Sequence, residues 1–284
     1  MGPDHDVVLL HDPELLLALP GISLPPVVWD VHEDTSAAVS MKSWLPDQVK
    51  PAAAGGMRTL ERWAEKHVTV LLAEDGYAER FAMPHTVVPN TTNVPTTVTE
   101  PGTTRVAYLG AVTKQRGALD MIEIATLLHG LVTVDLIGPV HADVAADVQR
   151  AHDSGVLVSH GFVPNDEALA LLDGALAGLS LLHNEPNYQR SRPTKIIEYM
   201  AHGVPVITTP LPVAVDIVER ADCGVVVDFD DAPAAAAAIL ALRSDHARRK
   251  RLGTAGHQAA LAEYDWRTQG PLFVAAVEAA AHLR

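Results

Sequence analysis

The chain has 284 residues, of which 48% are hydrophobic and 20% charged, and this composition is typical of a globular protein rather than a disordered or fibrous one. This length accommodates either one large domain or two of ordinary size. The formal net charge of -14 disfavours broad binding to nucleic acid or to anionic lipid, because both carry negative charge. Any phosphate ligand must therefore meet a local basic site.

The cysteine content and the lengths of the apolar runs exclude further classes of protein. Cys223 is the only cysteine, so the chain cannot form an internal disulfide or a Cys-rich zinc site. The apolar runs, such as residues 7–10 and 176–182, are shorter than the roughly 20 residues of a membrane-spanning helix. We therefore expect a cytoplasmic protein with no transmembrane segment.

Short apolar or β-branched runs alternate with segments of helical spacing, a rhythm that is typical of α/β folds with parallel sheets. The expected strands cover residues 7–10, 27–29, 68–72, 106–109, 132–137, 156–158, 179–182, 204–207 and 225–227. The expected helices between them include residues 117–128, 143–152, 166–172 and 195–201. Each helix would serve as a crossover between neighbouring strands.

A threonine- and proline-rich segment, residues 89–104 (PNTTNVPTTVTEPGTT), interrupts this rhythm and is typical of a linker. It separates residues 1–88, with three expected strands, from residues 105–262, which resemble a complete doubly wound domain. A three-stranded parallel sheet with an open edge and one uncovered face is a poor independent domain. We therefore expect the first part either to lack some elements or to lean on a second copy of the chain or on a partner chain.

The most specific segment is residues 185–210, which predict a loop, a helix, a tight turn and a buried strand. Ser191 can cap the helix, Pro193 suits its first turn, and Gly203 can supply the left-handed residue that ends it. Helical periodicity places one set of side chains on the polar face of this helix. That set is Thr194, Lys195, Glu198 and His202.

The polar face of this helix suggests a nucleotide site. A helix N-terminus with free amides and a nearby lysine, here Thr194 and Lys195, can bind a diphosphate. A carboxylate one turn further along, Glu198, can accept hydrogen bonds from a vicinal diol such as that of ribose. On spacing alone, a capped amphipathic helix without a ligand explains the segment equally well.

The sequence PTKIIEYMAHGVPVI, residues 193–207, resembles the donor-site signature of glycosyltransferase family 4, a group of retaining enzymes with the GT-B fold. The resemblance implies that Glu198 binds the ribose hydroxyls and that Thr194 and Lys195 contact the diphosphate of a UDP- or GDP-type sugar. Many members carry an earlier acidic residue that contacts the sugar. This chain has Arg190 there, and Glu185 in the preceding loop is a candidate substitute.

Two further segments resemble strand ends of the donor domain of that family. Residues 106–122 (VAYLGAVTKQRGALDMI) resemble its first strand, glycine loop and helix. The resemblance implies that Gly110 lets the backbone approach the donor and that Arg116 holds the diphosphate, although Ala111 replaces a second basic residue. LIGP with Gly138 and HGFVP with Phe162 resemble later strand ends, and the latter would lie beside the base.

Residues 27–34 (VVWDVHED) predict a buried strand that ends in polar residues, which is the usual place for site groups in an α/β sheet. His32 matches a histidine that contacts the transferred sugar in many family members. Without the resemblance, a surface or capping histidine is the simpler interpretation. The end of the chain, residues 263–284, resembles the closing helix of the family, which crosses back to the N-terminal domain.

These resemblances imply a GT-B α/β fold with two Rossmann-like doubly wound domains. Residues 1–88 would form a truncated acceptor-side domain, and residues 105–262 would form the donor domain. The implied activity is hexosyl transfer, with retention, from a nucleoside-diphosphate sugar to an unknown acceptor, with His32, Arg116 and Lys195 as catalytic residues. We expect no cofactor and no metal, because no two histidines are spaced as helical ligands with a third nearby.

Three alternatives stay open at this stage. One is a non-catalytic subunit or partner-dependent fragment that binds a nucleotide sugar without consuming it. Another is a GT-B epimerase, which would convert the donor without an acceptor. The third is a structural remnant, which would neither bind nor convert the donor.

Overall fold

The computed structural model describes residues 5–36, 39 and 45–282. The chain divides into two compact units, each containing a wholly parallel sheet. The first unit comprises Met1–Asn90, Arg190–Arg192 and Trp266–Arg284, and the second comprises Thr91–Gln189 and Pro193–Asp265. Among the described residues, no helix is both long and apolar enough to cross a membrane.

The first unit has a four-stranded sheet of order β1-β2-β3-β4. The strands are β1 (Val8–Leu10), β2 (Val27–Val31), β3 (Thr69–Leu72) and β4 (Thr86–Val87). Strand β4 is absent from the expected strands, because a strand of only two residues, Thr86–Val87, makes no recognisable apolar run. The sheet therefore has one more strand than the sequence predicts.

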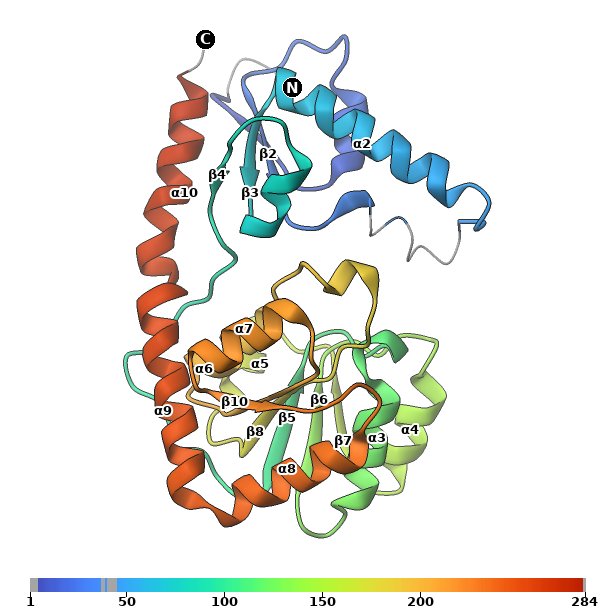
Figure 1. The fold of residues 1–284 in the computed structure, drawn as a ribbon, viewed down its shortest axis with the longest axis vertical. Coiled ribbons are helices and arrows are strands. Elements are labelled where there is room, and N and C mark those ends of the chain that lie inside the picture. The colour runs from blue at the N-terminus through green and yellow to red at the C-terminus, as the bar shows by residue number, and fades with distance from the viewer. Residues whose placement is uncertain (1–4, 37–38, 40–44, 283–284) are drawn as a thin grey trace. The chain divides into compact units, whose positions relative to one another are not determined.

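Both faces of this sheet are covered by helices (Figure 1). On one side, helix α2 (Lys50–His67) and the short 3-10 helix η1 (Pro13–Ala18) pack around Trp29. On the other side, Phe273 of helix α10 (Trp266–Ala281) packs with Val28 and Leu71. The closing helix, which the family resemblance places against the N-terminal domain, thus covers the face that this sheet would otherwise leave open.

The second unit has a six-stranded sheet of order β10-β9-β8-β5-β6-β7. Its strands are β5 (Arg105–Leu109), β6 (Thr133–Ile137), β7 (Val158–Gly161), β8 (Ala177–Ser180), β9 (Val206–Thr208) and β10 (Gly224–Val226). This is the strand order of a doubly wound nucleotide-binding sheet, in which the connections reverse direction between β5 and β8. Ligands of such sheets bind beyond the carboxyl ends of the strands at that point.

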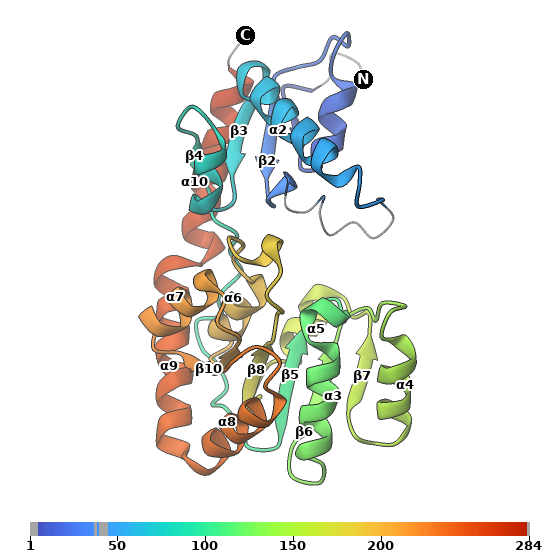
Figure 2. The ribbon, with the colours of Figure 1, turned by 45° about the vertical axis from the view of Figure 1, so that its right-hand side comes forward.

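Helices cover both faces of this second sheet (Figure 2). Helices α3 (Ala118–Leu127), α4 (Ala145–Asp153) and α8 (Ala232–Ser244) pack on one face. Helices α5 (Asn165–Ala170), α6 (Thr194–Ala201) and α7 (Pro212–Arg220) pack on the other, and α9 (His246–Glu263) lies against α6. Each helix packs on the sheet through the side on which its apolar residues recur with helical spacing.

The segment that the sequence predicts as a linker, residues 89–104, packs against the second unit over most of its length. Val94 is buried in the core formed by α6 and α7. The amide of Gly102 donates to the carbonyl of Gly174 at 2.9 Å. A segment rich in threonine and proline thus gains its order from the surface it lies on.

Strand β8 begins earlier than the sequence predicts because of a contact with helix α6. Gly178 has low strand propensity, yet a Cβ placed on it would lie 2.4 Å from the ring of Tyr199. The absence of a side chain lets this ring lie flat on the strand. Packing from a distant segment thus overrides local propensity.

The hydroxyl of Tyr199 ties helix α6 to two strands at the reversal point. It donates to the carbonyl of Leu179 in β8 at 2.9 Å and accepts from the amide of Leu109 in β5 at 2.9 Å. All three groups are buried. The start of α6 is therefore held at the carboxyl edge of the sheet.

We expect Tyr199→Phe to destabilise the protein by about 1–3 kcal/mol, because the buried amide of Leu109 loses its partner. Calorimetric melting should show a lower transition temperature. Tyr264→Phe is the matched control, since the hydroxyl of Tyr264 accepts from Arg220 in a partly buried position, and Arg220 keeps its ion pair with Glu263. An equal loss in both variants would contradict a special anchoring role for Tyr199.

Candidate functional site

A cavity of about 340 Å³ lies at the carboxyl ends of β5, β6 and β7, beside the start of α6 in the second unit. It is lined by every predicted site residue except His32. The lining residues are Leu109, Gly110, Arg116, Ile137, Gly138, Pro139, Phe162, Val163, Asn165, Ala168, Thr194, Lys195 and Glu198. Four segments far apart in sequence thus meet at the point where doubly wound sheets bind ligands.

Two glycines bring the strand ends together beneath the cavity. Gly110 has φ +121 and Gly138 has φ +146, a region of backbone conformation that favours glycine. A Cβ on Gly138 would lie 2.1 Å from the carbonyl oxygen of Gly110. Backbone hydrogen bonds from Gly110 to Ile137 and from Gly138 to Gly161, both 2.9 Å, join the three strand ends.

The glycine loop after β5 fixes the position of Arg116. Thr113 caps the short 3-10 helix η3 (Lys114–Arg116) by accepting from the amide of Arg116 at 3.3 Å. Gly117 then turns the chain with φ +80, and a Cβ there would lie 2.4 Å from the carbonyl oxygen of Leu181. The loop is therefore held against β8 on one side and presents Arg116 to the cavity on the other.

Lys195 is buried, although helical periodicity predicts that it lies on the polar face. Its side chain is covered by the glycine loop and by Tyr108, whose ring centroid lies 5.3 Å from the ammonium nitrogen. Burial, together with the nearby charge of Arg116, lowers the pKa of Lys195 to about 7. The cation–π contact with Tyr108 offsets only part of this cost.

Lys195 and Arg116 approach the same glycine. A Cβ on Gly110 would lie 3.7 Å from Nη1 of Arg116 and 3.8 Å from Cε of Lys195. Two cations in a confined space repel each other, and a bound anion would remove that repulsion. A buried lysine with a strongly lowered pKa inside a cavity is a mark of a functional site.

Glu198 lies one helical turn after Lys195 and is half-buried. Burial raises the pKa of its carboxyl group, while Lys195 and His202 oppose that rise. His202, which periodicity also places on the polar face, is buried, and its Nδ1 lies 2.9 Å from a carboxylate oxygen of Asp173. The polar face of α6 is therefore narrower than the sequence predicts.

The expected cap of helix α6 is wrong. Pro193 occupies the position before the helix, and no side chain caps it. The hydroxyl of Ser191 lies 3.3 Å from that of Tyr77 in the first unit. Gly203 does end the helix in the left-handed conformation that the sequence predicts, with φ +67.

Aromatic and polar side chains complete the cavity. Phe162 follows the strand residue Gly161 and is 78% exposed, which is unusual for so large an apolar side chain. Asn165, at the start of α5, and Tyr108, beneath Lys195, were not predicted as site residues. The only sequence signal for Asn165 is its place after a strand end, and Tyr108 is indistinguishable from a core residue.

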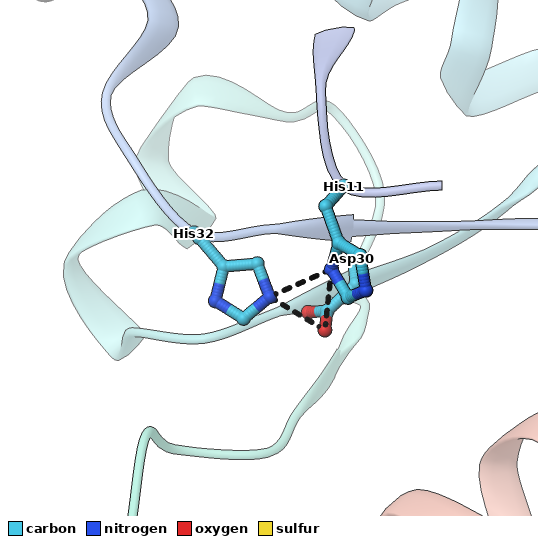
Figure 3. Close-up of side chains that lie close together, drawn as sticks. All are labelled: His11, Asp30 and His32. Carbon is cyan, nitrogen blue, oxygen red and sulfur yellow. Dashed lines mark hydrogen bonds and ion pairs between the residues drawn. The ribbon is translucent and has the colours of Figure 1, made fainter. Parts of the chain in front are cut away.

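His32 lies in the first unit, at the carboxyl end of β2 (Figure 3). Its Nε2 lies 2.8 Å from Oδ2 of Asp30 and 3.0 Å from Nδ1 of His11. On the other side of the ring, Nδ1 lies 3.2 Å from Oδ1 of Asn90. The hydrogen bond to Asp30 raises the pKa of His32, although partial burial opposes the rise.

A second titratable group of the first unit lies just beyond the carboxyl end of β3. Burial raises the pKa of Glu74 to about 7, although Arg192, whose Nη2 is 3.5 Å from a carboxylate oxygen, opposes the rise. Glu74 was not predicted as a site residue. Arg190, which stands where an acidic residue was expected, pairs with Glu79 at 3.0 Å.

Comparisons with known proteins identify the kind of protein to which this architecture belongs. A family model described as glycosyl transferases group 1 matches residues 103–245. No curated protein matches the sequence.

Several solved structures resemble the chain over nearly its whole length. The sucrose-phosphate synthase of Thermosynechococcus elongatus is 17% identical, with a TM-score of 0.71 over 97% of this chain and 74% of that one. Anabaena HepE in complex with UDP-glucose is 15% identical, with a TM-score of 0.75 over 96% and 79%. AviGT4, a glycosyltransferase of avilamycin A biosynthesis, is 18% identical, with a TM-score of 0.63 over 99% and 76%. These similarities confirm the predicted GT-B fold class.

We expect Lys195→Met to stabilise the ligand-free protein at neutral pH, because methionine fills a similar space without a buried charge. Between about pH 7 and 10.5 the folded wild type binds fewer protons than the unfolded chain, so its free energy of unfolding rises with pH relative to that of the variant. The advantage of the variant is therefore full below pH 7 and fades as the pH rises. Melting curves over this range measure the difference.

Lys114→Met is the matched control for this measurement, because Lys114 belongs to the same glycine loop but is exposed. Its melting temperature should stay close to that of the wild type. A Lys195→Met variant that melts below the wild type at pH 7 would contradict the strained burial of this ammonium group.

Proposed function

Because the chain belongs to the glycosyl transferases group 1 family, we propose that it transfers a hexosyl group from a UDP- or GDP-type sugar to an acceptor, with retention, as glycosyltransferases of family 4 do. The observation that carries this proposal is the single cavity in which Arg116, Lys195 and Glu198 meet the backbone of two glycines. This combination of cations, carboxylate and open backbone suits a nucleoside diphosphate.

Arg116 and Lys195 bind the diphosphate in this proposal. The negative charge of the ligand relieves the repulsion between the two side chains and favours the protonated form of Lys195. Thr194 opens helix α6, whose first amides point toward the same anion. Gly110 and Gly138 let the ligand approach the backbone, since neither carries a side chain into the cavity.

Glu198 accepts hydrogen bonds from the ribose hydroxyls, and Phe162 stacks on the base. Stacking of an aromatic side chain on a base contributes about 1–3 kcal/mol, which gives the exposed ring of Phe162 a function. Anabaena HepE has been solved with UDP and with UDP-glucose. Its similarity in fold supports a nucleotide-sugar donor for this chain.

In the reaction, the bond between the anomeric carbon and the diphosphate oxygen breaks, and negative charge develops on the leaving diphosphate. Arg116 and Lys195 stabilise that charge, which is the electrostatic contribution expected to matter most. We propose that these two side chains take the place of a metal ion at the donor. His32 contacts the transferred sugar.

A non-catalytic nucleotide-sugar-binding protein is the second candidate. Arg190 favours it, because the family resemblance leads one to expect a sugar-binding acid at that position, and Arg190 pairs with Glu79 instead. Such a protein would bind the donor without consuming it. The two candidates therefore share the donor site and differ in turnover.

The donor site is tested by thermal stability of the purified chain against nucleoside diphosphates and their sugars. A ligand at about 100 times its dissociation constant should stabilise the fold by about 2.7 kcal/mol. We expect a shift selective for one base, lost in Glu198→Ala and retained in Glu219→Ala, an exposed control on helix α7. The absence of any nucleotide-dependent shift would overturn the donor-site assignment.

Turnover is tested by incubating the donor with panels of acceptors and following release of nucleoside diphosphate. We expect Arg116→Met to lower kcat by about 10²- to 10³-fold, by analogy with lost oxyanion donors. The anomeric configuration of the product, read by NMR, should match that of the donor. Donor that is bound but never consumed would favour the binding protein, and conversion without acceptor would favour an epimerase.

A further inference from the structure

Three metal-ligating side chains converge at the carboxyl edge of the sheet in the first unit: His11, Asp30 and His32 (Figure 3). Strands β1 and β2 are parallel, with Leu10 paired to Trp29, so the next residues, His11 and Asp30, are neighbours across the sheet. Asp30 lies in β2 and His32 directly follows its last residue, Val31, so the two side chains, two positions apart, point to the same side. Strand register alone thus brings the three side chains together.

The distances among the ligand atoms fit a small metal ion. His32 Nε2 lies 2.8 Å from Asp30 Oδ2, His11 Nδ1 lies 3.0 Å from His32 Nε2, and His11 Nδ1 lies 3.5 Å from Asp30 Oδ2. Ligand bonds of about 2.0–2.1 Å in a tetrahedral zinc site separate the ligand atoms by about 3.3 Å. The observed triangle is close to one face of such a tetrahedron.

The three ligand atoms can all donate electron pairs, which favours a cation between them. In the tautomer that donates from Nδ1 to Oδ1 of Asn90, 3.2 Å away, the ring proton of His32 lies on Nδ1. Nε2 is then a lone pair that faces an oxygen of Asp30 and a nitrogen of His11. A single shared proton satisfies only part of this set, whereas a divalent ion can accept from all three.

The surroundings match those of known metal sites. Metal-binding histidines usually donate their other ring N–H to a fixed acceptor, which orients the ring, and Asn90 has that place for His32. Asp30 is buried, while the two imidazoles are partly exposed, so an ion can enter from solvent. Two histidines and one carboxylate leave at least one coordination position open.

We propose that His11, Asp30 and His32 form a binding site for a divalent transition-metal ion of the zinc class. This site goes beyond the proposed sugar transfer, because it lies in the first unit and uses no residue of the donor cavity. The sequence does not predict this site, since the two histidines lie 21 residues apart and do not have the spacing of metal ligands on one helix. Imidazole and carboxylate together favour zinc, nickel, copper or cobalt over magnesium.

One consequence of this site rests on the proposed function. If His32 contacts the transferred sugar, an ion bound to its Nε2 competes with that contact. Zinc would then inhibit transfer while leaving the binding of nucleoside diphosphate in the second unit unchanged.

The site is tested by titrating the untagged full chain with Zn²⁺ by calorimetry and with Co²⁺ by visible absorption, which reports coordination by protein ligands. We expect saturation at one ion per chain. His11→Gln should weaken binding by more than the roughly 10- to 100-fold that loss of an outer partner costs, and Asn90→Ala should weaken it by about that amount. Melting curves of both variants without metal verify that each is folded.

His183→Gln is the matched control. His183 lies 2.9 Å from Asp120 and 3.6 Å from Asp230 in a separate cluster of the second unit, and its loss should leave the high-affinity ion bound. Loss of the ion in His183→Gln, unchanged binding in His11→Gln, or no binding to the wild type would each overturn the proposal. Because nucleotide-induced stabilisation is read separately, failure of the metal site and failure of the donor site give different results.

Discussion

The arrangement of the second unit depends on one buried hydroxyl group. Tyr199 lies flat on Gly178 and bonds to both β5 and β8, so the two strands at the reversal of the sheet share one anchor with helix α6. Tyr199 follows Lys195 by four residues and Glu198 by one on α6, so its anchoring to the two strands also fixes where these two side chains enter the cavity.

The same helix places Lys195 where its charge is costly. Arg116 and the burial of Lys195 both disfavour its ammonium form, and the ring of Tyr108 compensates in part. Natural proteins commonly keep such locally destabilised groups where a ligand will use them. In the proposed donor site, a bound anion would favour the ammonium form of Lys195, which burial and Arg116 disfavour.

Much of this architecture could be predicted from the sequence, and the exceptions have physical reasons. Apolar runs located most strands, and family resemblance named seven of the thirteen residues that line the cavity. Helical periodicity placed Lys195 on the polar face. The spacing of residues within one helix cannot show that the glycine loop after β5 covers this side chain. His11 and Asn90 were not predicted as neighbours of His32, because no local spacing in the sequence brings them together. His11 reaches His32 through the register of β1 and β2, and Asn90 through a later segment of the chain. Strand β4 was too short to make a pattern.

Helix α10 has a consequence for how the protein is made. It covers Val28 and Leu71 of the first sheet, yet its residues follow the whole second unit in the sequence. During synthesis, the second unit can complete its core while one apolar face of the earlier sheet is still exposed to solvent or to chaperones. The first sheet therefore cannot complete its core first, as N-terminal domains usually do, because its cover is synthesised last. Loops that close over so many residues also form slowly.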